Sequence, residues 1–136
     1  MTSEFTIGVH ALVYLYHKNE TLSSEVLAEN ICTNPARVRK VLAKLKIKGF
    51  VDTREGLRGG YHIGMPADKI TLKDICDALQ EEMVKASWKS GSADMDCLVS
   101  KGMAGIMDGL CTELNSLCLD YLDQLTIVDI EKRIFL

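Results

Sequence analysis

Apolar residues recur every three or four positions near the start of the chain and predict consecutive helices. The segment from Glu4 to His17 has this spacing. A shorter helix is expected over Ser24–Ile31, because the Ser23 hydroxyl can accept a hydrogen bond from a free N–H group of its first turn. His10 falls inside the first segment, where we expect a packed side chain rather than a metal ligand.

A third helix is predicted from Pro35 to Lys48. Asn34 can cap it, Pro35 suits its first position because proline has no N–H group to leave unpaired, and Gly49 is typical of a helix end. Its apolar residues form one narrow stripe: Val38, Val41, Leu42 and Leu45. The opposite face carries Ala36, Lys40 and Ala43, and the cations Arg37 and Lys44 flank it. Small side chains let a helix approach a nucleic-acid groove closely while cations reach the phosphates, so this face favours DNA binding.

The pattern then changes from helical to strand-like. Residues 50–54 and 61–63 are typical of paired strands, and the glycine-rich segment 55–60 between them is a flexible tip. Two short helices, a basic third helix and a basic-tipped hairpin make a winged helix-turn-helix. The tip lacks the Gly-Lys-Ser/Thr ending and the following helix of a nucleotide-binding P-loop. The fold class is therefore mainly α with a small β-hairpin.

The second half of the chain predicts a linker at residues 65–68 and a helix from Thr71 through Glu82. Residues 83–96 are the least informative, and Trp88 is their only large anchor. A final short helix is expected over residues 126–136.

A long amphipathic pattern runs from Leu98 to about Asp123, with apolar residues three and four positions apart. So small a winged-helix core cannot bury the whole stripe, and pairing with a second copy is the simplest solution. Gly102, Gly105 and Gly109 weaken the helix by about 0.5–1 kcal/mol each. They permit close helix crossing or mark a mobile first half, and both interpretations stay open. We expect a winged helix-turn-helix domain at residues 1–80 and a linker with dimerisation helices at residues 81–136.

Charge is unevenly distributed along a chain whose net charge is −3. Residues 1–62 hold nine basic and six acidic residues, a net +3, whereas residues 63–136 hold seven and thirteen, a net −6. This asymmetry suggests an anionic partner for the first half, although a solvated basic helix face would look the same. The composition is that of a globular protein, and neither a signal peptide nor a membrane-spanning run is evident. We therefore expect a cytoplasmic protein.

The layout resembles the Rrf-type family of bacterial winged-helix transcriptional regulators over nearly the whole chain. The resemblance rests on the apolar opening helix and on four segments: SSEVLAENI, NPARVRKVLAKLKIKGFV, RGGYHIGMPADKITLKDICDAL and YLDQLTIVDI. It implies a homodimer that binds a two-fold operator in double-stranded DNA, with residues 34–44 as the recognition helix and Arg58 able to enter a minor groove. The implied DNA-binding residues are Thr33, Asn34, Ala36, Arg37, Arg39, Lys40, Lys44, Arg54, Arg58, Gly59, Gly60 and Tyr61.

Many members of that family sense through an iron–sulfur cluster held by three closely spaced cysteines before the long helix. This chain has only Cys97 between Gln80 and Leu110. A cluster usually needs three or four protein ligands, so we expect neither a cluster nor another metal or cofactor.

Three of the five cysteines, Cys76, Cys111 and Cys118, lie on apolar helix faces and are expected to be small core residues. Cys32 precedes the third helix and lies near several cations, which favours its thiolate form. Cys97 lies among acidic neighbours, which would raise its pKa. The family includes thiol-based redox sensors with cysteines at these two places. The resemblance therefore implies a reversible disulfide between Cys32 and Cys97, formed between subunits, and a redox-responsive repressor.

Other functions remain open at this stage. A regulator of the same fold could respond to a small ligand or a cluster, and a winged helix could bind protein rather than DNA. An enzyme is not expected, because no histidine–cysteine motif supports a thiol nucleophile.

Overall fold

The computed structural model describes residues 1–136 and begins with three helices that each start at a capping side chain. Helix α1 spans Ser3–Lys18, α2 spans Ser24–Ile31 and α3 spans Pro35–Ile47. The hydroxyl of Ser23 accepts from the Val26 N–H, and the side chain of Asn34 accepts from the Arg37 N–H at 2.9 Å. The capping pattern therefore predicted the starts of α2 and α3 correctly.

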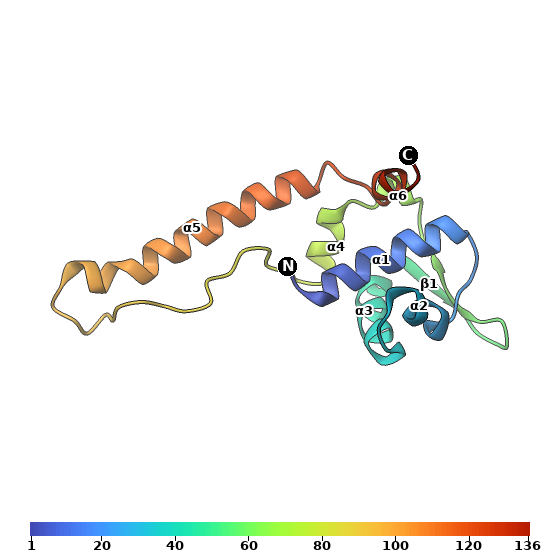
Figure 1. Ribbon diagram of the computed structural model, residues 1–136, viewed down its shortest axis with the longest axis horizontal. Coiled ribbons are helices and arrows are strands. Elements are labelled where there is room, and N and C mark those ends of the chain that lie inside the picture. Colours follow the sequence, from blue (N-terminus) through green and yellow to red (C-terminus); the bar gives the residue numbers. More distant parts are fainter.

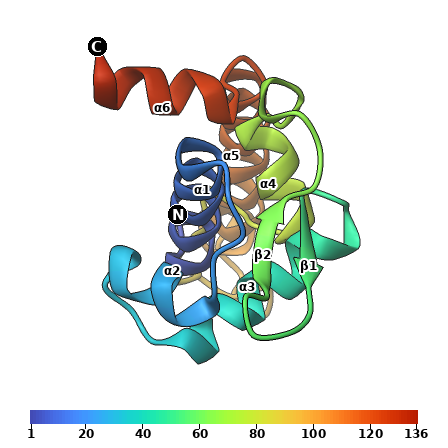
Figure 2. The same cartoon turned by 90° about the vertical axis from the view of Figure 1, so that its right-hand side faces the viewer.

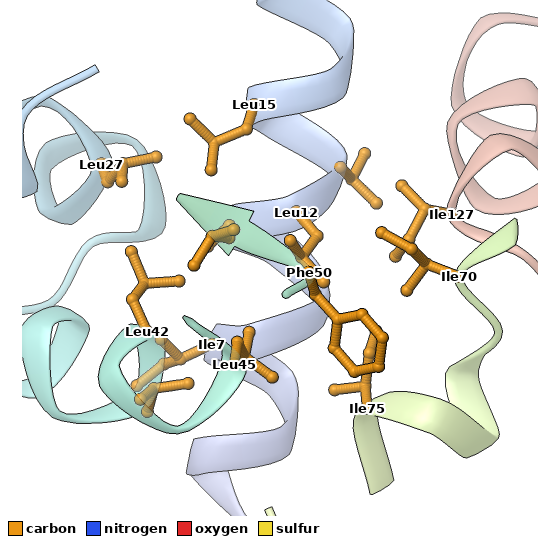
Figure 3. Packing of buried hydrophobic residues seen from close by; sticks show 14 of the residues in the cluster. Ile7, Leu12, Leu15, Leu27, Leu42, Leu45, Phe50, Ile70, Ile75 and Ile127 are labelled. Carbon is orange, nitrogen blue, oxygen red and sulfur yellow. The ribbon is translucent and has the colours of Figure 1, made fainter. Parts of the chain in front are cut away.

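The hydrophobic core lies around α1, between the α2–α3 pair on one side and α4 (Leu72–Ala78) and α6 (Ile127–Phe135) on the other (Figure 3). Leu12 and Leu15 of α1 are almost completely buried, as is Ile127 of α6. Gly8 of α1 faces the side chains of Val41, Ile75 and Leu79, so α1 packs directly against α3 and the end of α4 at this point. The core thus includes a helix from the end of the chain.

The wing is a two-stranded antiparallel hairpin of β1 (Val51–Arg54) and β2 (Gly60–Ile63), with Val51 opposite Ile63 (Figure 2). Leu22, just before α2, extends the hairpin because its N–H and C=O both bond to Tyr61, at 2.8 and 2.7 Å. The wing is therefore fixed at its base to the helix-turn-helix.

Two expectations for residues 65–82 are corrected. The expected linker contains a turn of 3-10 helix, η1, over Ala67–Lys69. Helix α4 ends at Ala78, four residues before the predicted Glu82. Gln80 adopts a left-handed conformation with φ 53°, and the Glu81 N–H bonds to the Cys76 carbonyl, which closes the helix. The usual signals of a helix end, Gly or Asn, are both missing here, which is why the periodicity predicted a longer helix.

Helix α5 spans Leu98–Leu122 and extends away from the winged-helix core, with residues 83–97 running back beside it (Figure 1). None of its residues is buried, although its stripe is apolar. The Asn115 amide binds both the N–H and the C=O of Val84, at 2.8 and 2.7 Å, which fastens the preceding segment to α5. Trp88 is 79% exposed, so the prediction that it anchors residues 83–96 is wrong within a single chain. No helix has the length and apolar character needed to cross a bilayer.

Gly60 provides the most direct test of how the wing is attached. Its φ is 148°, and an added Cβ atom would overlap the Leu22 carbonyl oxygen. We expect Gly60→Ala to lower the melting temperature by about 5 °C or more, because backbone strain costs on the order of 1–3 kcal/mol. Gly102→Ala is the matched control, since open space surrounds Gly102 and alanine favours a helix. Equal melting of Gly60→Ala and wild type would contradict this attachment of the wing.

Candidate DNA-binding surface

The turn between α2 and α3 fixes where the third helix begins. Cys32 ends α2 in a left-handed conformation with φ 62°, and the Thr33 N–H bonds back to the Ala28 carbonyl at 3.0 Å. Asn34 then caps α3 two residues later. This tight reversal makes α2 and α3 a helix-turn-helix.

The buried stripe of α3 determines which residues point outward. Val38, Val41, Leu42 and Leu45 are each 0–1% exposed, which confirms the predicted stripe. The side chains on the opposite side form what we call the outward face: Ala36, Lys40, Ala43 and Ile47. Ile47 is 82% exposed and was missed by the sequence analysis, which treated the end of this helix only as a boundary. Helical periodicity alone would have placed it on the outward face.

Neighbouring elements hold the two arginines beside the outward face. Arg37 donates to the Ser3 hydroxyl at 2.6 Å and to the Thr33 hydroxyl at 3.3 Å. On the other flank, Arg39 donates to Ser24 at 3.0 Å. The partners of Arg37 are neutral, so its charge stays available to an anion. Arg39 also lies 3.8 Å from the Glu25 carboxylate, with which an anion has to compete.

Glu4 of α1 pairs with two lysines of α3. Its carboxylate lies 3.3 Å from Lys40 Nζ and 3.0 Å from Lys44 Nζ. The hydrogen bond from Lys44, followed by that from Lys40, holds the pKa of Glu4 below its ordinary value. Any phosphate that approaches these lysines must therefore compete with Glu4, a pairing between helices that the sequence analysis did not anticipate.

The wing adds Arg54 at the end of β1 and Arg58 in its tip, and neither forms an ion pair within the chain. The backbone of the wing requires glycine at positions 59 and 60, because a Cβ atom at either position would overlap a backbone oxygen. Tyr61 is half-buried and its backbone binds Leu22. The wing glycines thus shape the loop that presents the arginines.

Two of the five free cysteines, Cys32 and Cys97, are exposed. Cys97 lies at the start of α5, where the backbone N–H groups of Ser100 and Val99 lower its pKa. The expected rise caused by acidic neighbours is therefore wrong. Cys32 ends α2, and the turn between α2 and α3 lies far from the start of α5 in the same chain (Figure 1).

The other three cysteines are on helices. Cys76 is buried, and burial raises the pKa of its thiol. Cys111 and Cys118 of α5 are half-buried rather than core residues in one chain. His10 is also only half-buried and its Nε2 lies 2.8 Å from the Asn30 side-chain oxygen, so a hydrogen bond rather than packing holds it.

The chain is similar to known regulators in sequence and in fold. It is 32% identical over 82 residues to YwnA of Bacillus subtilis strain 168, described as an HTH-type transcriptional regulator, and the match covers 60% of each chain. A structure from Lactobacillus plantarum, described as a transcriptional regulator, has a TM-score of 0.81 at 22% identity and covers 98% of this chain and 91% of that one. The oxidised form of Staphylococcus aureus CymR has a TM-score of 0.70 at 17% identity, covering 96% and 94%. These structural likenesses show the fold.

A family model described as Rrf2, iron-dependent transcriptional regulator, matches residues 1–133. The residues of one chain do not fit an iron site, because no three histidine, cysteine, aspartate or glutamate side chains gather closely enough to hold a metal ion. Along α5, Cys111 lies 14 residues and therefore about 21 Å beyond Cys97, too far to join it around one cluster. The winged helix-turn-helix and the match over nearly the whole chain agree: this protein belongs to the Rrf2 family of transcriptional regulators.

Proposed function

We propose that this Rrf2-family regulator is a cytoplasmic homodimeric repressor that binds a two-fold operator in double-stranded DNA. The observation that carries the proposal is the outward face of α3, where small side chains lie between cations on the exposed side of the helix. Such a surface fits a major groove, because bases can be approached closely while phosphates are contacted at both sides.

Each part of the surface has an assigned role in the proposal. The outward face reads base edges, while Arg37 and Arg39 bind phosphates on the two flanks. Arg58 extends from the wing into a minor groove, where negative potential is concentrated. The remaining proposed contacts come from the start of α3, its lysines and the wing: Thr33, Asn34, Ala36, Lys40, Lys44, Arg54, Gly59, Gly60 and Tyr61.

Salt dependence tests DNA binding whatever the sequence of the operator. With a duplex selected from a random-sequence pool, the affinity should fall steeply as salt rises, because bound cations release counterions from the phosphates. Arg37→Ala and Arg58→Ala should each weaken binding about five- to tenfold and reduce the salt slope by about one. The matched control is Arg133→Ala, which removes the same charge from α6. Affinity that is flat in salt and unchanged in Arg37→Ala and Arg58→Ala would refute the proposal.

The apolar stripe of α5 supports a dimer. Ile106, Leu114 and Leu117 are 59%, 45% and 64% exposed, and Leu110 and Tyr121 continue the same stripe. A contiguous apolar surface of this length is typical of a protein–protein contact. A second copy provides an equally apolar helix, and a two-fold dimer would present two copies of α3 to one duplex.

We expect the chain to elute at the mass of a dimer in size-exclusion chromatography with light scattering. Leu114→Glu should shift it toward the monomer, because a charge would be buried in the middle of the contact. Thr112→Glu places the same charge on the other side of α5 and should leave the dimer intact. A monomeric wild type, or a Leu114→Glu variant as dimeric as wild type, would exclude α5 as the contact.

We further propose that Cys32 of one subunit and Cys97 of the other form a reversible disulfide. Both thiols are exposed, and the lowered pKa of Cys97 favours the reactive thiolate. Two thiols lose two protons and two electrons to a peroxide, which is reduced to water, and a sulfur–sulfur bond forms. One structure of similar fold, that of S. aureus CymR, is of an oxidised form. The bond would join the turn before α3 of one subunit to the start of α5 of the other.

Hydrogen peroxide should produce a covalent dimer on a non-reducing gel, and reductant should reverse it. The band should be absent in Cys32→Ser and in Cys97→Ser. A two-fold dimer would form two such disulfides, and each change removes one of the two sulfur atoms that every disulfide needs. Cys76→Ser alters a buried thiol and should keep the band. A band that persists in both of the first two variants would show that another pair reacts.

A further inference from the structure

An apolar pocket lies between α1 and α6, on the opposite end of the core from the α3 stripe. It has a volume of about 680 Å³, which is within the range of small-molecule sites in proteins. Figure 2 shows α6 lying across one end of α1, with α2 farther along the same helix. We call this hollow the α1–α6 pocket. Its apolar lining comes from three helices and comprises Phe5, Val9, Val13, Leu72, Ile130 and Ile134.

The walls of the α1–α6 pocket are accessible to a ligand. Val9 and Ile130 are half-buried, and Ile134 is 61% exposed. Phe5 and Leu72 also line the pocket but are almost completely buried, so the pocket is closed toward the core. An apolar molecule in the pocket would remove apolar surface from water, which is favourable.

Side-chain contacts hold the helices around the pocket. At the end of α1, the His17 ring stacks on the Phe135 ring of α6, with the ring centroids 4.4 Å apart. At another edge, His10 Nε2 lies 2.8 Å from the side-chain oxygen of Asn30 in α2. All four side chains line the pocket. The pocket is therefore formed before any ligand arrives, as is usual for small-molecule sites.

The charge on the pocket wall determines which apolar molecule fits. Lys18 lines the pocket, is exposed and forms no ion pair within the chain. Its Nζ lies 5.8 Å from the centroid of the Tyr14 ring, another lining residue, and this contact favours a position at the edge of the pocket. No aspartate or glutamate lines the pocket. The wall therefore attracts an anionic group and repels a cationic one.

We propose that the α1–α6 pocket binds a small apolar molecule that carries one carboxylate, such as a medium-chain fatty acid. The apolar chain contacts Val9, Ile130 and Ile134, and the carboxylate pairs with Lys18. This site depends neither on DNA binding nor on dimerisation. It provides a place for the response to a small ligand that the sequence left open.

The first experiment titrates octanoate, octan-1-ol and octylammonium into the isotope-labelled full chain and follows the backbone amide signals by NMR. The amides that shift should belong mainly to α1 and α6. Octanoate should bind about two- to fivefold more tightly than octan-1-ol, since an exposed ion pair adds little to the affinity of the chain. Octylammonium should bind more weakly than the alcohol. No binding of octanoate, or equal binding of octanoate and octylammonium, would overturn the inference.

Three exposed positions separate the charge from the apolar contact. Lys18→Gln should make octanoate bind no better than octan-1-ol and leave the alcohol unchanged. Ile134→Asn should weaken both ligands by a similar factor, because it removes apolar surface from the wall. Lys132→Gln removes the same charge from α6 outside the pocket and should bind as wild type. An unchanged preference for octanoate in Lys18→Gln, or unchanged binding in Ile134→Asn, would place the ligand elsewhere and overturn the inference.

The second experiment asks whether another copy of the chain fills the pocket instead. Light scattering is measured on wild type with and without saturating octanoate, and on Ile134→Asn. The mass should be the same in all three samples if the pocket holds a small molecule. A dimer that octanoate or Ile134→Asn converts to monomer would show that a second copy occupies the pocket, which would overturn the inference. If wild type is a monomer, the proposed dimer fails and the titration alone decides the pocket.

Discussion

The packing of the α3 stripe against α1 is the constraint on which the candidate site depends. Val38, Leu42 and Leu45 are completely buried, so α3 cannot rotate about its axis without exposing them. Full burial of one such side chain contributes about 1.5–3 kcal/mol, far more than the surface contacts of the cations on the same helix. Because the helix cannot rotate, Ala36, Lys40, Ala43 and Ile47 have to face outward. The hydrophobic core therefore determines which residues meet an external partner.

The same core leaves α5 without a place to bury its stripe. The winged-helix part is completed by α6, whose Ile127 is fully buried, while α5 extends away from it (Figure 1). The chain thus combines a compact unit with an arm whose apolar residues have no cover. In our proposal the arm joins two copies, and Cys97 at its start reaches the partner's turn before α3. Dimerisation and redox sensing then use different parts of one helix.

Local signals predicted much of this fold from the sequence. Ser23 and Asn34 fix helix starts through hydrogen bonds that span only three residues, and the stripe of α3 follows from helical periodicity. Contacts between distant residues were not predictable in this way. The Glu4 pairs with Lys40 and Lys44 and the Leu22–Tyr61 bridge depend on how the elements come together.

Exposure was predicted less well than helix position. Trp88 was expected to be an anchor but is exposed, because composition does not say whether a large side chain has a partner in the same chain. The pKa of Cys97 was expected to rise with its acidic neighbours, but backbone N–H groups at the start of α5 lower it. His62 was expected only as a residue of a returning strand, and the assembled wing shows that its Nδ1 is buried without a hydrogen-bond partner.

The central claim is that two copies of this chain read duplex DNA together through α3 and the wing. Footprinting on a duplex selected by the protein tests this most directly. The expected result is two protected segments related by two-fold symmetry and separated by about one or two helical turns. A single protected segment, or complete absence of protection from a protein that is folded and dimeric, would contradict it.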